Sequence, residues 1–231
     1  MAFRRREGRE TREEAPVAPV AWAGVREFTI GSMERPATKR RPRPVRGPRA
    51  IRVPAGSGDG QVFAPCAYVA RSTPPVPPTA MDRCLYEDAE SQRLLCYLVA
   101  RELPDGESRY EVYDAEHRPI GTLRRIPPSG RLFKHTWRMH QPGHPDVVGR
   151  NQWHPARLAH RAAENFVPEV LNIVTGLGPD DSHGPQRKAR TLEWVADGDA
   201  VMVSESVKLL RVEQDWLDRR LAFAYAFLGD G

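Results

Sequence analysis

The last apolar run of the chain is the feature that most limits how it folds. Residues 221–228 read Leu-Ala-Phe-Ala-Tyr-Ala-Phe-Leu, and the tyrosine hydroxyl is the one polar group among their side chains. A helix that is apolar on every side has no face for water, so it must be buried on every side. The run is much shorter than the roughly 20 residues that span a bilayer. We therefore expect the rest of the chain to enclose this helix.

The residues before the run have the pattern of a helix start. Asp215 is the expected N-cap, and Asp218 follows three residues later. Both carboxylates then lie where a helix N-terminus favours negative charge. The final helix is accordingly predicted to begin near Trp216.

Seven segments have the apolar density or the polar and apolar alternation of β-strands. They are residues 94–101, 109–114, 119–126, 132–139, 191–196, 200–205 and 207–212. Short connections such as Asp197-Gly198 predict antiparallel hairpins. Seven such strands suffice to wrap one helix, which predicts an α+β fold. In it, a mostly antiparallel β-barrel or strongly curved sheet surrounds the buried hydrophobic C-terminal helix.

Between residues 154 and 177 the apolar residues change to helical spacing. Pro168 cannot occupy a helix interior without losing a hydrogen bond and clashing with the preceding turn. This stretch therefore predicts one or two short helices, inserted between the strands.

The first 80 residues differ from the rest in composition. They hold 12 of the 22 prolines, 15 of the 35 Lys and Arg residues, and 7 of the 30 Asp and Glu residues. Their net charge is therefore +8, whereas residues 81–231 have a net charge of −3. They have no sustained periodicity, so we expect residues 1–80 to be a disordered basic arm and residues 82–231 to be a single barrel-type domain.

The same composition has a second explanation. Arginine outnumbers lysine 31 to 4, which indicates a GC-rich gene. Non-coding GC-rich DNA read upstream of a true start also yields Arg, Pro, Ala and Gly. The true start would then be Met81 or Met33, and composition does not separate the two explanations.

Within the arm, residues 35–52 contain eight basic residues and no acidic one. The candidate contacts with phosphate are Arg40, Arg41, Arg43, Arg46 and Arg49. Binding of such a segment to nucleic acid or to an anionic membrane surface weakens steeply as the salt concentration rises.

Cysteine and histidine give little sign of chemistry. Cys66, Cys84 and Cys96 form no C-x-x-C pair, so a disulfide framework is not expected, and Cys96 lies in an apolar run as a buried thiol would. His135, His140, His144, His154 and His160 fall close together but lack the spacing of a metal site. We expect no metal and no cofactor.

Two segments resemble a known family. Residues 110–125 resemble the strand, turn and strand unit of the LURF-one-related proteins, which belong to the tubby C-terminal-like superfamily. Residues 216–228 resemble the closing segment of the same proteins, a hydrophobic helix threaded through a β-barrel. The insertion at 154–177 and His117, which stands where such turns usually carry glycine, depart from that pattern. The resemblance implies a binding or scaffold domain, with lipid-associated relatives, rather than an enzyme.

The sequence thus favours a non-enzymatic binding or scaffold protein that takes a lipid or an anion. Arg124, Arg125, Arg219 and Arg220 form the candidate anion site, provided that the hairpin and the helix start are adjacent. The alternative is a nucleic-acid-associated protein that binds through residues 35–52. No phosphate loop, nucleophile elbow or His-Glu-x-x-His motif is present, and no catalytic residue is predicted. Without a secretory signal or a membrane span, we expect a cytoplasmic, bacterial protein.

Overall fold

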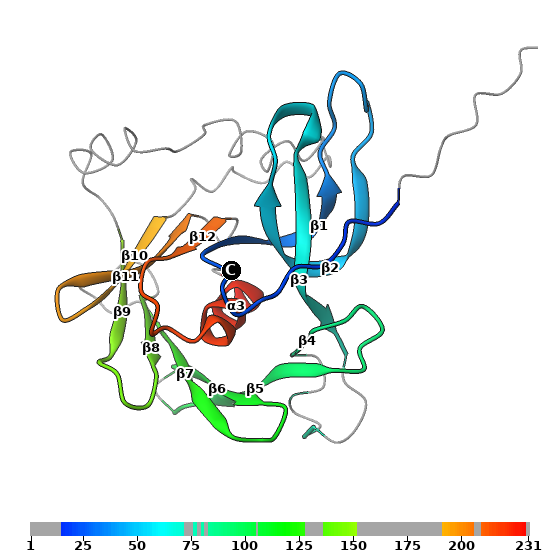
Figure 1. Ribbon diagram of the computed structural model, residues 1–231. Helices are drawn as coiled ribbons and strands as arrows, with labels where there is room; N and C mark the ends of the chain where they lie inside the picture. The colour runs from blue at the N-terminus through cyan, green and yellow to red at the C-terminus, as the bar shows by residue number, and fades with distance from the viewer. Residues whose placement is uncertain are drawn as a thin grey trace, which may run out of the picture.

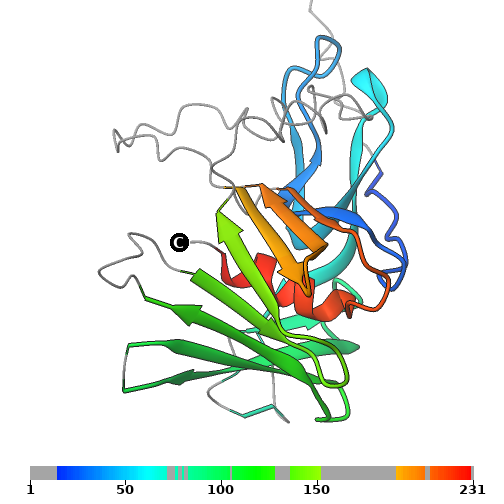
Figure 2. The ribbon, with the colours of Figure 1, turned by 90° about the vertical axis from the view of Figure 1, so that its left-hand side faces the viewer.

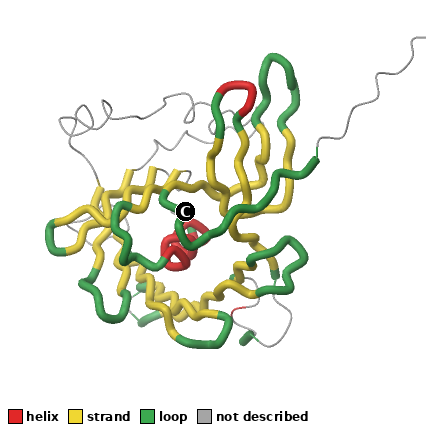
Figure 3. The backbone as a smooth tube through the Cα atoms, viewed as in Figure 1, coloured by secondary structure: helices red, strands yellow, loops and turns green. Residues whose placement is uncertain are grey.

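The computed structural model of the protein is a closed antiparallel β-barrel with one helix inside it. It describes residues 15–71, 76–77, 80, 83–104, 106–127, 136–151, 191–205 and 209–229. Figure 1 looks along the barrel, and Figure 3 shows the ring of strands around the helix. The strands are β1 (Glu27–Arg35), β2 (Val45–Ala55), β3 (Val62–Ala70), β4 (Cys84–Tyr86), β5 (Leu94–Glu102), β6 (Ser108–Asp114), β7 (Pro119–Ile126), β8 (Thr136–His140), β9 (Val147–Asn151), β10 (Thr191–Ala196), β11 (Asp199–Glu205) and β12 (Leu209–Val212).

Each strand pairs with its neighbours in chain order, and β1 pairs with β12 to close the barrel. The closing register sets Glu27 opposite Arg211 and Phe28 opposite Leu210. Closure satisfies the backbone hydrogen bonds that an edge strand would leave open. The predicted barrel is therefore confirmed, although it has more strands than the sequence pattern indicated.

The helix α3 (Arg219–Leu228) lies inside the barrel, and its residues 221–226 are all buried. The Phe223 ring packs edge-on against Phe28, with ring centres 4.8 Å apart. The Tyr225 ring packs against Trp137 and Trp194, with ring centres 5.3 and 4.6 Å apart. The Tyr225 hydroxyl lies 3.3 Å from Ser204 Oγ, which gives the one polar group of this run a partner. The buried helix is confirmed.

The helix start differs from the prediction. α3 begins at Arg219 and not near Trp216, and its N-cap is Asp218 and not Asp215. The Asp218 carboxylate accepts a hydrogen bond from the backbone N–H of Arg220 at 2.9 Å, whereas Asp215 lies in the preceding loop. Either aspartate satisfies the sequence preference for an N-cap, so the position was decided by the path of the chain into the barrel.

Glycine and turn residues shape the strands around α3. A Cβ on Gly121 would lie 2.3 Å from the backbone oxygen of His140 and 3.0 Å from a methyl carbon of Leu221, so only glycine lets β7 approach β8 and the helix this closely. The predicted Asp197-Gly198 turn has positive φ at both residues, 49° and 94°, as a two-residue hairpin of type I′ requires.

The expectation of a disordered arm over residues 1–80 is wrong for residues 27–70. These residues form β1, β2 and β3, with Phe28, Ile51 and Phe63 buried. Pro65 of β3 lies at a register shift between β2 and β3, and Pro48 of β2 lies where the register between β1 and β2 is irregular. β3 is buried along most of its length, whereas β1 and β2 contribute a few buried apolar side chains, such as Phe28, which packs against Phe223 of the helix. The barrel therefore includes residues that the predicted 82–231 domain leaves out.

Other expectations fall outside the described residues. These are the helices at 154–177, residues 1–14 of the arm and the first part of the strand predicted at 132–139. Among the residues that the structure describes, no helix is long and apolar enough to cross a membrane.

Candidate functional site

The candidate site lies at the end of the barrel where α3 enters. After β12, residues 213–218 cross this mouth before the helix begins. Gln141, in the turn between β8 and β9, holds the crossing segment with both ends of its amide. Its Nε2 donates to the backbone oxygen of Trp216, and its Oε1 accepts from the backbone N–H of Asp218, each at 2.8 Å. The mouth is thus fixed before any ligand binds.

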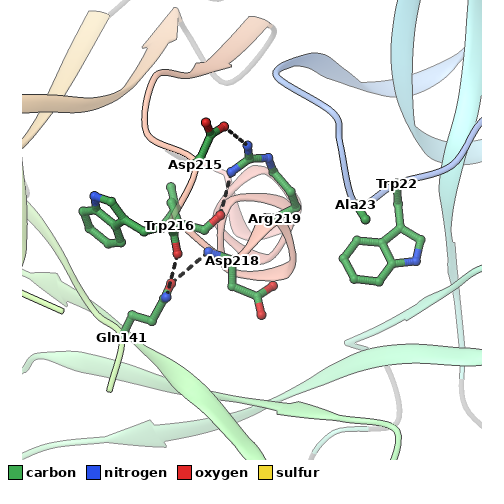
Figure 4. Close-up of a pocket in the computed structure, with 8 residues that line it drawn as sticks. Trp22, Ala23, Gln141, Asp215, Trp216, Asp218 and Arg219 are labelled. Atoms are coloured by element: carbon green, nitrogen blue, oxygen red, sulfur yellow. Dashed lines mark hydrogen bonds and ion pairs between the residues drawn. The ribbon is translucent and has the colours of Figure 1, made fainter. Parts of the chain in front are cut away.

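Two tryptophans stand on opposite sides of the helix start (Figure 4). The Trp216 ring stacks on His144 with ring centres 4.6 Å apart. Trp22 comes from the segment before β1, and its Nε1 donates to Glu87 at 2.9 Å. The Arg220 guanidinium lies over the Trp22 ring at 5.5 Å from its centre. The aromatic groups are therefore held in place by partners of their own.

Five charged side chains meet at this mouth. Arg220 binds both carboxylate oxygens of Asp218, at 3.0 and 2.7 Å, and Arg26 pairs with Asp215. The bond to Asp218 raises the pKa of Arg220. The fifth charged side chain is that of Arg219. Its Nη2 lies 3.7 Å from Asp215 Oδ1, the same oxygen that accepts a hydrogen bond from Arg26. Three arginines against two aspartates give this group a net charge of +1.

Arg219 is the unusual member of the group because its side chain is only 6% exposed. Its Nη1 donates to the backbone oxygens of Gln214 and Leu217, at 3.2 and 2.6 Å. Its Nε is buried and has no hydrogen-bond partner. Burial lowers the pKa of Arg219, and the positive charge of Arg26 adds to the shift. On the Nε–Nη2 edge of the guanidinium, Nε has no hydrogen-bond partner, and Nη2 lies 3.7 Å from the Asp215 carboxylate.

A cavity of about 260 Å³ opens at this point. Arg219, Asp215, Asp218, Gln141 and both tryptophans line it, together with Ala23 and Leu217. A buried donor without a partner costs about 1–3 kcal/mol. The charged residues that line the cavity are Arg219, Asp215 and Asp218, and the two aspartates are paired with Arg26 and Arg220. A cavity bordered by such a donor, by paired aspartates and by aromatic walls can take an anion with an apolar body.

The structure does not bring the four predicted arginines together. Gln141 of the mouth follows His140, which pairs with Thr122 of β7. Arg124 and Arg125 lie further along β7, towards its other end, where Ile126 pairs with Thr136. Arg124 pairs with Glu107 in the turn between β5 and β6, and Arg125 lies over the Trp137 ring at 6.0 Å. Only Arg219 and Arg220 belong to the mouth, and of these only Arg219 lines the cavity.

The predicted phosphate contacts of the arm lie on and beside the hairpin that joins β1 to β2. Arg40 pairs with Asp59 at 3.3 Å, and Arg41 donates to the backbone oxygen of Pro36. Arg43 is exposed, Arg46 donates to Ser32 Oγ at 3.2 Å, and Arg49 lies over the Phe227 ring. These side chains are carried by folded backbone rather than by a disordered arm.

A second hollow of about 400 Å³ lies on the outer wall. Pro77, Tyr97, Val99, Ala100, Arg101 and Tyr113 line it. Its polar side chains have partners: Tyr97 bonds to His117, and Tyr113 and Arg101 bond to Glu111. It therefore lacks the unsatisfied donor that distinguishes the mouth.

The cysteines and histidines that the structure describes do not assemble a metal site. Within the described ranges, no group of three or more His, Cys, Asp or Glu side chains could hold a metal ion. Cys66, Cys84 and Cys96 are free and buried, and burial raises the pKa of Cys66 to about 12. His140 pairs with Asp146 at 2.8 Å, and His144 stacks on Trp216. His135, His154 and His160 lie outside the described residues.

Comparison of the chain with models of protein families, with curated proteins and with solved structures finds no match. The sequence indicates Asp215 and Asp218 at the helix start and Arg219 as an anion contact, but it does not predict Trp22 or Gln141 at the site. Trp22 belongs to an apolar patch at residues 20–30, which is itself a signal of folded structure. Nothing in the sequence marks Gln141, because it acts through hydrogen bonds to Trp216 and Asp218. These two residues lie 75 and 77 positions later in the chain.

Proposed function

We propose that the protein is a non-enzymatic binding module that takes an anionic ligand at the mouth of its barrel. The observation that carries the proposal is the guanidinium of Arg219, which borders the cavity. On its Nε–Nη2 edge, the buried Nε has no hydrogen-bond partner, and Nη2 lies 3.7 Å from Asp215, beyond hydrogen-bond distance. A carboxylate or phosphate matches this edge of a guanidinium with two parallel hydrogen bonds. The start of α3 adds a partial positive charge.

The cavity walls narrow the class of ligand. A bare inorganic ion would leave the faces of Trp22 and Trp216 without contact, whereas an oxyanion with an apolar or aromatic body fills the space between them. A volume of about 260 Å³ suits the head of such a molecule rather than a polymer. Lipid headgroups and free metabolites both present this chemistry, so the shared group is an oxyanion attached to an apolar body.

The proposal is tested by calorimetric titration with benzoate, with phenyl phosphate and with a short-chain phosphatidic acid. Phosphate without an organic group serves as the bare ion. We expect Arg219→Met to weaken binding by about 10- to 150-fold, because a charge-assisted hydrogen-bonded contact contributes about 1.5–3 kcal/mol. Arg219→Lys keeps the charge but loses the planar fork, so binding should weaken with the net charge unchanged.

Arg124→Met is the matched control. It also removes one arginine that has an acidic partner, but at the other end of β7. Thermal melts of each variant separate lost binding from lost folding, since Arg219 also bonds to two backbone oxygens. Equal affinities for the wild-type protein, Arg219→Met and Arg219→Lys would refute the proposal, as would a loss of affinity in Arg124→Met. Binding of phosphatidic acid but not of the soluble acids would identify a lipid as the source of the oxyanion.

The resemblance to the LURF-one-related proteins belongs to the same proposal. Its support is the closed barrel around a hydrophobic C-terminal helix, together with the β6–β7 hairpin at the matching residues. A cytoplasmic location in a bacterial cell also remains a proposal, and fractionation of the source cells would test it.

A further inference from the structure

A second surface of the protein is independent of the mouth. The connections β1–β2 and β2–β3 stand out from one side of the barrel (Figures 1 and 2). Their tips are linked by the pair of Arg40 with Asp59, which joins residues from the two connections. We call the protruding residues 35–49 the basic hairpin.

The base of the basic hairpin is held by a buried arginine. Arg52 is 1% exposed and bonds to all three strands. Its Nε donates to Gly31 in β1 at 3.1 Å, and its Nη1 donates to Phe63 in β3 at 3.0 Å. Its Nη2 donates to Pro48 in β2 at 2.7 Å and to the Glu34 carboxylate at 3.3 Å. The hairpin is therefore a preformed ribbon, and binding through it does not require a disordered chain to become ordered.

The structure also divides the basic residues by role. Arg52 holds the fold, Arg35 donates to the backbone of Ala15, and Arg41 to that of Pro36. The exposed cations of the basic hairpin are Lys39, Arg40, Arg43, Arg46 and Arg49. The acidic groups nearest to them along these strands are occupied, since Glu34 pairs with Arg52 and Asp59 with Arg40. Lys39 and Arg43 thus present their full charge to solvent.

The surface chemistry favours nucleic acid over a membrane. Insertion into a lipid surface uses exposed aromatic or aliphatic side chains beside the cations. Among the residues that the structure describes, Val20 is the one large hydrophobic residue that is exposed, and it lies before β1. Four of the five exposed cations are arginines, whose guanidinium binds phosphate oxygens two at a time. A two-stranded ribbon also has the width that the major groove of a duplex admits.

We propose that the basic hairpin binds duplex nucleic acid through the phosphate backbone, with Lys39, Arg43 and Arg46 as the principal contacts. The proposed contacts are with phosphate groups and not with base edges, so binding should show little sequence preference. The mouth cavity and the basic hairpin involve different residues, so each can be disabled without the other.

The test compares two triple variants of the full chain. Lys39→Gln/Arg43→Gln/Arg46→Gln neutralises the basic hairpin. Arg93→Gln/Arg138→Gln/Arg150→Gln removes three exposed arginines from other parts of the barrel and changes the net charge equally. Point variants are needed because deletion of residues 1–80 would remove three strands of the barrel. Binding to a labelled 20-base-pair duplex is measured by fluorescence anisotropy from 50 to 200 mM salt.

We expect the hairpin variant to lose at least tenfold in affinity at 100 mM salt, and the slope of log K against log salt to become shallower by about 2.7, or about 0.9 for each phosphate contact removed. The control triple variant should change much less. A variant with Arg43→Lys and Arg46→Lys keeps both charges and should retain most of the affinity, which excludes misfolding as the cause.

Three results would overturn the proposal. The first is that wild-type protein does not bind the duplex at 50 mM salt. The second is an equal loss in the hairpin and control variants, which would reflect net charge alone. The third is binding through the hairpin to vesicles with 30% phosphatidylserine but not to duplex, which would assign the surface to a membrane instead.

Discussion

Replacement of Arg52 by methionine should be among the most destabilising single changes outside the core around α3. Arg52 is 1% exposed, and the Glu34 side chain beside it is 9% exposed. Methionine fills a similar length but donates no hydrogen bond, so it leaves three backbone oxygens and one carboxylate without their donor. Breaking a buried pair from one side costs about 3–5 kcal/mol.

In a chain of this size each kcal/mol shifts Tm by about 2–4 °C, so Arg52→Met should lower Tm by about 6–20 °C. The assay is urea unfolding and thermal unfolding followed by circular dichroism, with exposed Arg138→Met as the control. The double variant Arg52→Met/Glu34→Met should be more stable than Arg52→Met alone, because no charge is then stranded. A loss below about 1 kcal/mol, or a double variant no better than the single one, would show that Arg52 does not hold the three strands.

Two other predictions concern the core and the β6–β7 turn. Ala224→Asp places a charge at a position with no exposed surface. We expect the free energy of unfolding to fall by more than about 4 kcal/mol, with loss of the folded signal in circular dichroism. A stable variant would mean that α3 is not enclosed. Burial alone would raise the pKa of Asp114, but hydrogen bonds from the backbone and side chain of Arg118 lower it overall. Its folded pKa is below the unfolded one, so its stabilisation is present above about pH 4 and is lost as the pH falls through the folded value. In melts between pH 2 and 5, Asp114→Asn should therefore show a shallower loss of stability than wild type, and an identical pH dependence would contradict this reasoning.

The sequence was informative where a pattern depends on neighbouring residues. Alternation placed β6, β7, β10 and β11 closely, and the apolar run gave the buried helix and hence the barrel. It failed for β1, β2 and β3, because they belong to the first 80 residues, whose average composition is rich in Arg and Pro. These strands are stabilised by contacts that a composition average does not reveal, such as Phe28 with the distant Phe223 and the bond from Arg52 to Phe63 in the next strand. A composition average does not detect a few correctly spaced apolar residues.

The candidate site was only partly predictable for the same reason. The helix start and its charges can be identified from residues 215–220, because they are consecutive. Whether Arg124 and Arg125 join them depends on the end of the barrel at which β7 finishes, and that follows from the order of the hairpins. The cavity itself needs Trp22 and Gln141, which the fold brings from distant segments.

The proposed binding site requires that an oxyanion bind the Nε–Nη2 edge of Arg219. The most direct measurement is the nuclear magnetic resonance signal of the Arg219 Nε–H in ¹⁵N-labelled protein, assigned from its disappearance in Arg219→Lys, during titration with phenyl phosphate. We expect a saturable shift of this signal with one-to-one stoichiometry, while the Arg124 Nε–H signal stays in place. A signal of Arg219 that does not move at saturating ligand, or a shift of Arg124 instead, would contradict it.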